Sequence, residues 1–490
     1  MSVSKFLAID LGAESGRAIL GVLENNKIHL EEIHRFPNKQ IYILGHLHWD
    51  VLALFEEIKT GMRIAVQKGH GDIESIGVDT WGVDFGFAGK NNELLGFPYC
   101  YRDSRTNNMM EKLFQTIPRE EIYSVTGIQF WQFNSIFQLA RYADDDSDML
   151  RVADILLFMP DIINFLLTGV KKTEYTIAST SQLLNAYSKN WDLSLLEKLK
   201  LPINIMPEIV PPGTVIGKLL PEIAKEVGLK EIEVIAPGCH DTASAVAAVP
   251  IQGINSAFVS SGTWSIIGIE SATPIINEAS LKNNFTNEGG VGNKIRFMSN
   301  MMGMWLLQQT RKSWLKQNVN ISYEEMTKLA SDAKPFKCII DTDDNSFYNP
   351  PDMQEAIREY CIKNNQPIPG SKGEYVRCIL ENLAIKYKTM IEKINSMSGK
   401  KIDTLHIVGG GSQNELLNQF AADACGIPVV AGPVEATALG NIIVQAIAKN
   451  KIASLDDGRR IVAESFQVKT YQPKKSRCLE EQFSIIISVL

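Results

Sequence analysis

One layout occurs twice in this 490-residue chain: a short apolar strand, a turn of small and polar residues, and a returning strand. The first copy runs from Phe6 to Leu23 and the second from Ile254 to Ile269. Each pattern predicts a β-hairpin. Because a layout repeated in both halves of a chain indicates repeated structure, we expect two domains of similar topology, 1–246 and 247–490. A chain of this length can form about two to four domains with sizeable cores.

The turn of the first hairpin contains residues that suit an anion. Gly12 and Gly16 let backbone N–H groups approach a ligand, Ser15 adds a hydroxyl, and Asp10 ends the first strand with a carboxylate. An ordinary hairpin, with Gly and Asp as turn formers, explains these residues equally well. The chain has no Walker loop, and a strand rather than a helix follows the glycines, which excludes a dinucleotide fingerprint.

An aspartate lies at a strand-to-helix turn between the two hairpins. Val234–Ala236 predicts a strand, Pro237-Gly238 a turn, and Thr242–Ala248 a helix. Asp241 precedes that helix, where a carboxylate can cap backbone N–H groups and is favoured by the helix dipole. A helix cap and a catalytic carboxylate both fit this position.

Two further turns follow predicted strands. The segment Asp79–Phe85 places two carboxylates and Trp81 at the end of a strand, which suits a polyol pocket, although a turn with the indole in the core fits as well. The strand Thr404–Val408 runs into Gly409-Gly410-Gly411. A turn without side chains can lie flat against a planar ring or a ribose.

Composition excludes several classes of function. A net charge of -7 and a pI near 5.7 argue against a nucleic-acid-binding surface, and no apolar run is long enough to span a membrane. The residues before Phe6 lack the pattern of a signal peptide, so we expect a cytoplasmic protein. None of the seven cysteines forms a Cys-x-x-Cys pair, so a structural zinc site is not expected. A disulfide between Cys361 and Cys378 is the less favoured alternative in a reducing compartment.

Together these segments predict phosphoryl transfer. They supply two turns for phosphates, a glycine turn for a nucleoside, a carboxylate-and-Trp pocket for a polyol, and an aspartate between the two halves. Transfer from ATP to a sugar hydroxyl needs such groups, because positioning and charge neutralisation do most of its catalysis.

At these motifs the chain resembles the FGGY carbohydrate kinases. The resemblance covers residue 6 to about residue 450 and rests on Asp10–Arg17, Asp79–Phe85, Gly238–Thr242, Ser261–Trp264 and Gly409–Asn414. It implies an α/β fold of two actin-like, ribonuclease-H-like domains with an interdomain catalytic cleft. Residues 1–246 would hold the sugar and the first phosphate loop. Residues 247–490 would bind the nucleotide and carry a C-terminal helical extension.

The resemblance also implies a role for each site residue. Asp241 would be the general base, and Asp10 would hold Mg²⁺ through water. The residues implied for ATP are Ala13, Glu14, Ser15, Gly16, Arg17, Gly262, Thr263, Gln308, Gly410 and Gly411. The residues implied for the sugar are Trp81, Gly82, Asp84, His240, Thr242 and Asn300.

The resemblance is closest to the branch of the family that converts L-rhamnulose and ATP into L-rhamnulose 1-phosphate and ADP. The chain departs from the family pattern at Ala13-Glu14, where a Thr or Ser commonly follows the first glycine, and at Phe133–Ile136, where a lysine is often found. L-Fuculose and L-xylulose stay alternative substrates, because they differ by contacts of about 1–3 kcal/mol. A non-catalytic sugar or ATP sensor is a further alternative. We expect a ketose and ATP as the partners, without nucleic acid or membrane, and a monomer or homodimer.

Overall fold

The computed structural model describes residues 3–251 and 253–474. Contacts divide the chain into two compact units, which are described separately. The first unit comprises Met1–Pro250, Glu270–Phe297 and Ala436–Ser465, and the second comprises Ile251–Ile269, Met298–Glu435 and Phe466–Leu490. This division differs from a single boundary at residue 246, because two later segments return to pack with the first unit.

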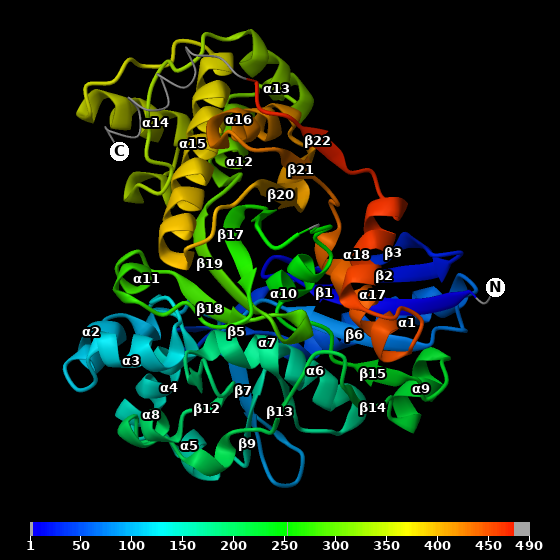
Figure 1. Ribbon diagram of the computed structural model, residues 1–490. Helices are drawn as coiled ribbons and strands as arrows, with labels where there is room; N and C mark the ends of the chain where they lie inside the picture. The colour runs from blue at the N-terminus through cyan, green and yellow to red at the C-terminus, as the bar shows by residue number, and fades with distance from the viewer. Residues whose placement is uncertain (1–2, 252, 475–490) are drawn as a thin grey trace. The chain divides into compact units, whose positions relative to one another are not determined.

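The main sheet of the first unit has six strands in the order β14-β15-β6-β1-β2-β3 (Figure 1). The hairpin of β1 (Ser4–Leu11) and β2 (Ser15–Glu24) is antiparallel, as predicted. Its strands are longer than expected, so only residues 12–14 form the turn. On the other side β1 pairs in parallel with β6 (Ser75–Thr80), and β6 with β15 (Glu233–Ile235). The carboxyl ends of β1, β6 and β15 therefore meet at one edge of the sheet.

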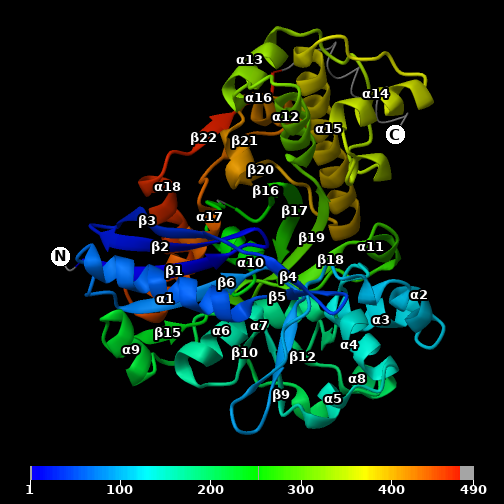
Figure 2. The same ribbon diagram turned by 180° about the vertical axis from the view of Figure 1, so that it is seen from behind.

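Helices cover both faces of this sheet. Helix α1 (Val51–Gln67) packs on β2 and β3, and α17 (Ala436–Ala448) packs on β1 and β6 from the opposite face (Figures 1 and 2). The strands between them are buried on both sides and read as nearly continuous apolar runs, as expected for a covered parallel sheet. Helix α1 starts where Asp50 Oδ1 accepts a hydrogen bond from the N–H of Ala53, at 3.0 Å.

The other elements of the first unit surround this sheet. Its remaining strands are β3 (Lys27–Pro37), β4 (Gln40–Ile43), β5 (His46–Trp49), β7 (Phe85–Ala88), β8 (Leu94–Leu95), β9 (Ile155–Phe158), β10 (Thr173–Glu174), β11 (Leu184–Asn185), β12 (Asn190–Trp191), β13 (Ile209–Val210), β14 (Val215–Lys218) and β18 (Thr286–Gly289). Its remaining helices are α2 (Met109–Phe114), α3 (Arg119–Thr126), α4 (Ser135–Asp144), α5 (Asp148–Val152), α6 (Met159–Thr168), α7 (Tyr175–Ala178), α8 (Leu193–Lys198), α9 (Pro221–Val227), α10 (Asp241–Ala247), α11 (Glu278–Lys282) and α18 (Leu455–Ser465).

The sheet of the second unit repeats the local topology of the first. The sheet has the strand order β18-β19-β17-β16-β20-β21-β22, in which β18 and parts of β17 and β19 belong to the first unit. Strand β16 pairs antiparallel with β17 and in parallel with β20, just as β1 pairs with β2 and β6. The predicted similarity of the two halves is confirmed at this level. The strands are β16 (Ser256–Ser261), β17 (Trp264–Ser271), β19 (Ile295–Met302), β20 (Thr404–Val408), β21 (Val429–Ala431) and β22 (Lys469–Tyr471).

The longest helix, α15, spans Lys372–Ser398 and is the long yellow helix of Figure 1. It packs against two other helices of the second unit, α13 and α16. The further helices of this unit are α12 (Trp305–Lys316), α13 (Tyr323–Asp332), α14 (Met353–Lys363) and α16 (Glu415–Cys425). Helix α18 belongs to the first unit by its contacts, and residues 475–490, at the end of the predicted C-terminal helical extension, lie outside the described residues. Among the described helices, none is both long enough and apolar enough to cross a membrane.

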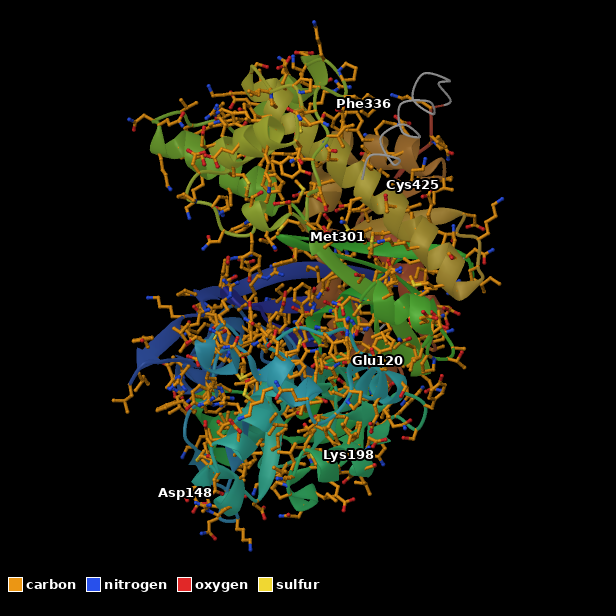
Figure 3. All side chains as sticks on the ribbon, turned by 90° about the vertical axis from the view of Figure 1, so that its left-hand side faces the viewer. Glu120, Asp148, Lys198, Met301, Phe336 and Cys425 are labelled. Atoms are coloured by element: carbon orange, nitrogen blue, oxygen red, sulfur yellow. The ribbon has the colours of Figure 1, made fainter. Side chains whose placement is uncertain are left out.

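The described cysteines are all free. Cys378 Sγ lies 2.9 Å from the sulfur of Cys338, a neighbour that the sequence pattern did not indicate. Cys361 is buried nearby on α14, and Cys425 is the last residue of α16 (Figure 3).

Candidate active site

The turn that carries Asp241 connects β15 to α10. Gly238 is favoured in this turn, because a Cβ atom there would lie 3.0 Å from the backbone nitrogen of Ser244, a tight contact. His240 occupies the N-cap position, and Asp241 is the first residue of the helix instead of its cap. Its Oδ1 atom accepts hydrogen bonds from the N–H of Thr242 at 2.5 Å and from the hydroxyl of Thr242 at 3.1 Å. In the described part of the chain no hydrogen bond reaches Oδ2, so that oxygen is available to accept a proton.

His240 joins Asp241 to a buried ion pair. Its Nε2 atom lies 3.4 Å from Oδ1 of Asp241, and its Nδ1 atom lies 3.1 Å from Oε2 of Glu288. Arg296 Nη2 is 3.1 Å from the same Glu288 oxygen. Burial alone would raise the pKa of Glu288, but the hydrogen bond with His240 and the charge of Arg296 outweigh it and lower the pKa, so this carboxylate stays ionised.

Sequence patterns did not indicate Glu288 or Arg296. The one available signal is an arginine between two apolar residues, Ile295 and Phe297, which are buried on β19. A fully buried guanidinium needs a partner, and Glu288 on the neighbouring strand β18 supplies it.

Three carboxylates gather at the carboxyl edge of the parallel strands. Asp10 and Asp79 are paired in register on β1 and β6, and Thr80 forms a bridge to His240. Asp79 is fully buried, its Oδ2 accepts a hydrogen bond from Asn441 at 2.5 Å, and its Oδ1 has no partner among the described residues. Burial, and then the charge of Asp10 and that of Asp241, raise the pKa of Asp79 well above its usual value. Burial and the charge of Asp10 also raise the pKa of Asp241, against the opposing effects of His240 and Thr242.

The first hairpin turn is held by protein contacts. The N–H of Gly12 donates to the carbonyl of Ser15 at 2.9 Å, and Arg17 Nη2 lies 2.5 Å from Oδ2 of Asp10. A Cβ atom at Gly16 would lie 2.3 Å from the ring of Phe36, so packing explains this glycine without a ligand. Of the residues implied for ATP in this unit, Ala13, Glu14, Ser15 and Arg17 are at least partly exposed and Gly16 is buried.

The Asp79–Phe85 segment forms an aromatic cluster around a buried carboxylate. Asp84 Oδ2 accepts hydrogen bonds from the indole of Trp49 at 2.6 Å, from the indole of Trp81 at 3.0 Å and from the N–H of Tyr101 at 3.1 Å. Its Oδ1 accepts one from Gln138 at 2.9 Å. Burial raises the pKa of Asp84 to about 6 although these donors oppose the shift.

These contacts give Asp84 a positioning role. With four protein donors on its two oxygens and no exposed surface, the carboxylate orders the aromatic side chains around it. Trp81 is 6% exposed, which agrees with the core interpretation of its indole, and Gly82 is more open, with Thr180 as its nearest neighbour. Direct contact of Trp81, Gly82 and Asp84 with a sugar stays a prediction.

In the second unit, the residues implied for the nucleotide lie around two adjacent turns. The hydroxyl of Thr263 donates to Oε1 of Gln308 at 3.2 Å, and the carbonyl of Gly262 accepts a hydrogen bond from the N–H of Met304 at 2.9 Å, just before α12. The glycine turn lies beside them, because a Cβ atom at Gly411 would be 1.9 Å from Oγ of Ser261.

Gly410 and Gly411, in the turn after β20, differ in how closely they approach other atoms. Gly411 is required by its closeness to Ser261, whereas a Cβ atom at Gly410 would meet nothing within 4 Å. Gly410 is also exposed, which leaves its backbone open to a flat ring. Asn300, implied for the sugar, is partly exposed on β19.

The residues present are compatible with a hydrated magnesium ion. Burial is the largest cause of the raised pKa of Asp79, and the charges of Asp10 and Asp241 add to it, so a cation at these carboxylates would offset the part that is due to charge. In the described ranges no three His, Cys, Asp or Glu side chains are arranged to ligate a metal together. Mg²⁺ keeps much of its water shell and binds phosphate oxygens, so it would need few protein ligands.

Comparison with known proteins gives a consistent result. Models of the N-terminal and C-terminal domains of the FGGY family of carbohydrate kinases match residues 5–248 and 257–449. A rhamnulokinase of Bacteroides thetaiotaomicron is 47% identical over 469 residues, covering 96% of each chain. A rhamnulokinase of Oceanobacillus iheyensis is 43% identical, covering 95% of this chain and 97% of the relative.

Solved structures share the fold at low sequence identity. A ligand-bound xylulose kinase from Lactobacillus acidophilus has a TM-score of 0.82 at 17% identity and covers 99% of this chain and 97% of its own. A glycerol kinase of Plasmodium falciparum with ADP has a TM-score of 0.79 at 16% identity, with coverage of 99% and 97%. The predicted α/β fold with two actin-like domains is confirmed.

Proposed function

The chain belongs to the FGGY family of carbohydrate kinases, and from this premise we propose that it is a rhamnulokinase, which phosphorylates L-rhamnulose at its 1-hydroxyl. Family membership implies the use of ATP. The observation that carries the reaction type is Asp241, a partly shielded carboxylate with one oxygen held by Thr242 and the other unengaged within the described residues. The ketose is suggested by full-length similarity to rhamnulokinases at 39–47% identity.

Asp241 acts as the general base. Its Oδ2 atom accepts the proton of the 1-hydroxyl as that oxygen forms a bond to the γ-phosphorus of ATP and the bond to the leaving ADP oxygen breaks. A carboxylate is a sufficient base, because in a loose transition state the proton leaves late. The raised pKa of Asp241 makes it a stronger base than an ordinary aspartate, which favours proton transfer to it at neutral pH.

The remaining predicted residues bind and orient the two substrates. Gly82, His240, Thr242 and Asn300 contact the ketose. Ala13–Arg17 and Thr263 contact the phosphates, and Gly410 and Gln308 lie on the nucleoside side. Mg²⁺ bound with ATP would neutralise phosphate charge, and Asp10 would hold it through water. Main-chain N–H groups near Gly262 and Thr263 stabilise charge on the transferring group.

A panel of ketoses tests the substrate. ADP release is measured by a coupled assay with L-rhamnulose, L-fuculose and L-xylulose at equal concentrations. We expect the highest kcat/KM for L-rhamnulose. A higher value for another ketose would reassign the substrate within the same class, and binding of ATP and ketose without turnover would indicate a sensor. A cytoplasmic location and a monomer or homodimer stay predictions.

A further inference from the structure

We propose that Glu288, supported by Arg296, is a positioning residue for the base: it fixes the ring of His240 with a proton on Nδ1 and with Nε2 facing Asp241. This role rests on the proposed function only in taking Asp241 as the base. Neither Glu288 nor Arg296 belongs to the motifs that indicated the site.

The four side chains form one chain of contacts within the first unit. Arg296 and Glu288 lie on the neighbouring strands β19 and β18, and His240 and Asp241 start α10. The contacts are 3.1 Å from Arg296 to Glu288, 3.1 Å from Glu288 to His240, and 3.4 Å from His240 to Asp241. The exposed fraction of the side chains rises along this series of contacts, from 0% for Arg296 and 8% for Glu288 to 12% for His240 and 33% for Asp241. The buried end is therefore rigid and the exposed end is the reactive one.

The surroundings of Nδ1 determine where the ring carries its proton. Both Glu288 Oε2 and Arg296 Nη2 lie 3.1 Å from Nδ1 of His240. If Nδ1 carries a proton, it donates a hydrogen bond to Glu288. If Nδ1 carries no proton, it accepts a hydrogen bond from Arg296. Arg296 already donates from Nε to the carbonyl of Gly289 at 2.7 Å and from Nη2 to Glu288 at 3.1 Å. A lone pair on Nδ1 would face the ionised carboxylate and be repelled. The proton therefore sits on Nδ1 and is donated to Glu288.

This arrangement turns Nε2 of the ring toward the base. Nε2 lies 3.4 Å from Oδ1 of Asp241, the oxygen that Thr242 also holds, so the ring and Thr242 fix this carboxylate from one side and leave Oδ2 for the sugar hydroxyl. The sugar hydroxyl gives its proton to Oδ2, and this transfer depends on the direction in which that oxygen is held. Because the orientation matters in the transfer step, its loss should lower kcat and leave the KM for ATP nearly unchanged.

A double-mutant cycle tests whether Glu288 acts through His240. We expect Glu288→Gln to lower kcat with the ketose about 10- to 100-fold, within the range of acid–base contributions, and to change the KM for ATP less than about twofold. In a His240→Gln background, the same change should alter kcat less than about twofold. Equal effects in both backgrounds would show that Glu288 acts independently and would overturn the proposal.

A matched control separates this role from the general loss of a buried ion pair. Glu381 on α15 pairs with Arg377 at 2.7 Å and is 3% exposed. Glu381→Gln removes the same charge from a similar environment in the second unit, and we expect its kcat to stay within about twofold of wild type. A loss of kcat equal to that of Glu288→Gln would contradict the positioning role.

A measurement on the unmutated protein does not depend on whether the variants fold. With ¹⁵N-labelled histidine, the ring signals of His240 are identified by their loss in His240→Gln or, if that variant does not fold, in His240→Asn. We expect a protonated Nδ1 at neutral pH, and an unprotonated Nδ1 would overturn the proposal. This readout needs no turnover, so failure of the whole ketose panel would reject the proposed function and leave the His240 result interpretable.

Discussion

At the scale of single residues, the site is built from carboxylates in unlike environments. Asp84 is enclosed by four donors, Asp79 is buried beside two other carboxylates, and Asp241 is partly exposed with one oxygen held by Thr242. Sequence spacing identified all three as candidates, because each follows a predicted strand. It did not separate their roles, since those depend on which donors tertiary contacts bring to each oxygen.

Replacing Asp241 by asparagine tests the base directly. Asp241→Asn keeps the Oδ1 acceptor for Thr242 but cannot take a proton, so we expect kcat to fall about 10²- to 10⁴-fold. Because burial and the charge of Asp10 disfavour ionised Asp241, the neutral amide should leave the Tm equal or higher. Steady-state kinetics and thermal melting check both results. More than a few per cent of wild-type turnover in a folded variant would contradict the role of Asp241.

Glu174 predicts a pH dependence of stability. Burial raises the pKa of Glu174 from 4.5 to about 7 against opposing hydrogen bonds from Thr176 and Cys239. Between these values the folded state holds a proton that the unfolded state releases, so the free energy of unfolding falls as pH rises, by roughly 3 kcal/mol in total.

The variant Glu174→Gln has no such proton. Urea unfolding at about pH 5 and about pH 8 should show wild type losing more stability than Glu174→Gln across this interval. Parallel changes in the two proteins would show that Glu174 does not titrate in this range.

At the scale of elements, α17 connects β1, β6 and α10 in the first unit. Asn441 donates to the carbonyl of Gly77 at 3.1 Å and to Asp79 on β6, and Gln445 donates to the carbonyl of Leu7 on β1 at 3.1 Å. Gly440 lies directly against α10, the helix that begins with Asp241. One helix thus contacts the three elements that carry the carboxylates.

The contact at Gly440 allows no side chain. A Cβ atom there would lie 1.7 Å from the backbone oxygen of Ser244, so Gly440→Ala must displace α10. We expect a loss of stability of about 1–3 kcal/mol and a lower kcat, because Asp241 moves with its helix. Gly71→Ala is the control, since a Cβ atom at Gly71 meets nothing within 4 Å and should change neither Tm nor kcat. A Tm unchanged by Gly440→Ala would show that the helices are not in tight contact.

At the scale of the whole molecule, the residues of the proposed site are divided between the two units. The proposed base, most of the predicted sugar contacts and the first phosphate turn lie in the first unit, and Thr263, Gln308 and the glycine turn lie in the second. Mg²⁺ acts on the phosphates of ATP, and none of the predicted sugar contacts is assigned to the metal, so we expect sugar binding to be separate from the metal requirement.

Removal of divalent cations tests this separation. After dialysis against EDTA we expect turnover to be lost and to return with added Mg²⁺, because the metal neutralises charge on the transferring phosphate. L-Rhamnulose should still raise the Tm of the metal-free protein, since a ligand that binds the folded state stabilises it. Full turnover without a divalent cation would contradict the metal's part in the reaction, and a Tm shift that depends on Mg²⁺ would contradict the separation.

The sequence by itself determined the hairpins, the strand before Asp241 and the internal repeat, because period and turn residues are local signals. The motif resemblance indicated the family, which the comparisons confirmed. Only the tertiary structure decided that α17 packs with the first unit, that Asp84 is enclosed by indoles, and that Glu288 and Arg296 support His240. Those contacts join residues far apart in the chain, and their partners are selected by burial and charge in the folded protein, which local spacing does not encode.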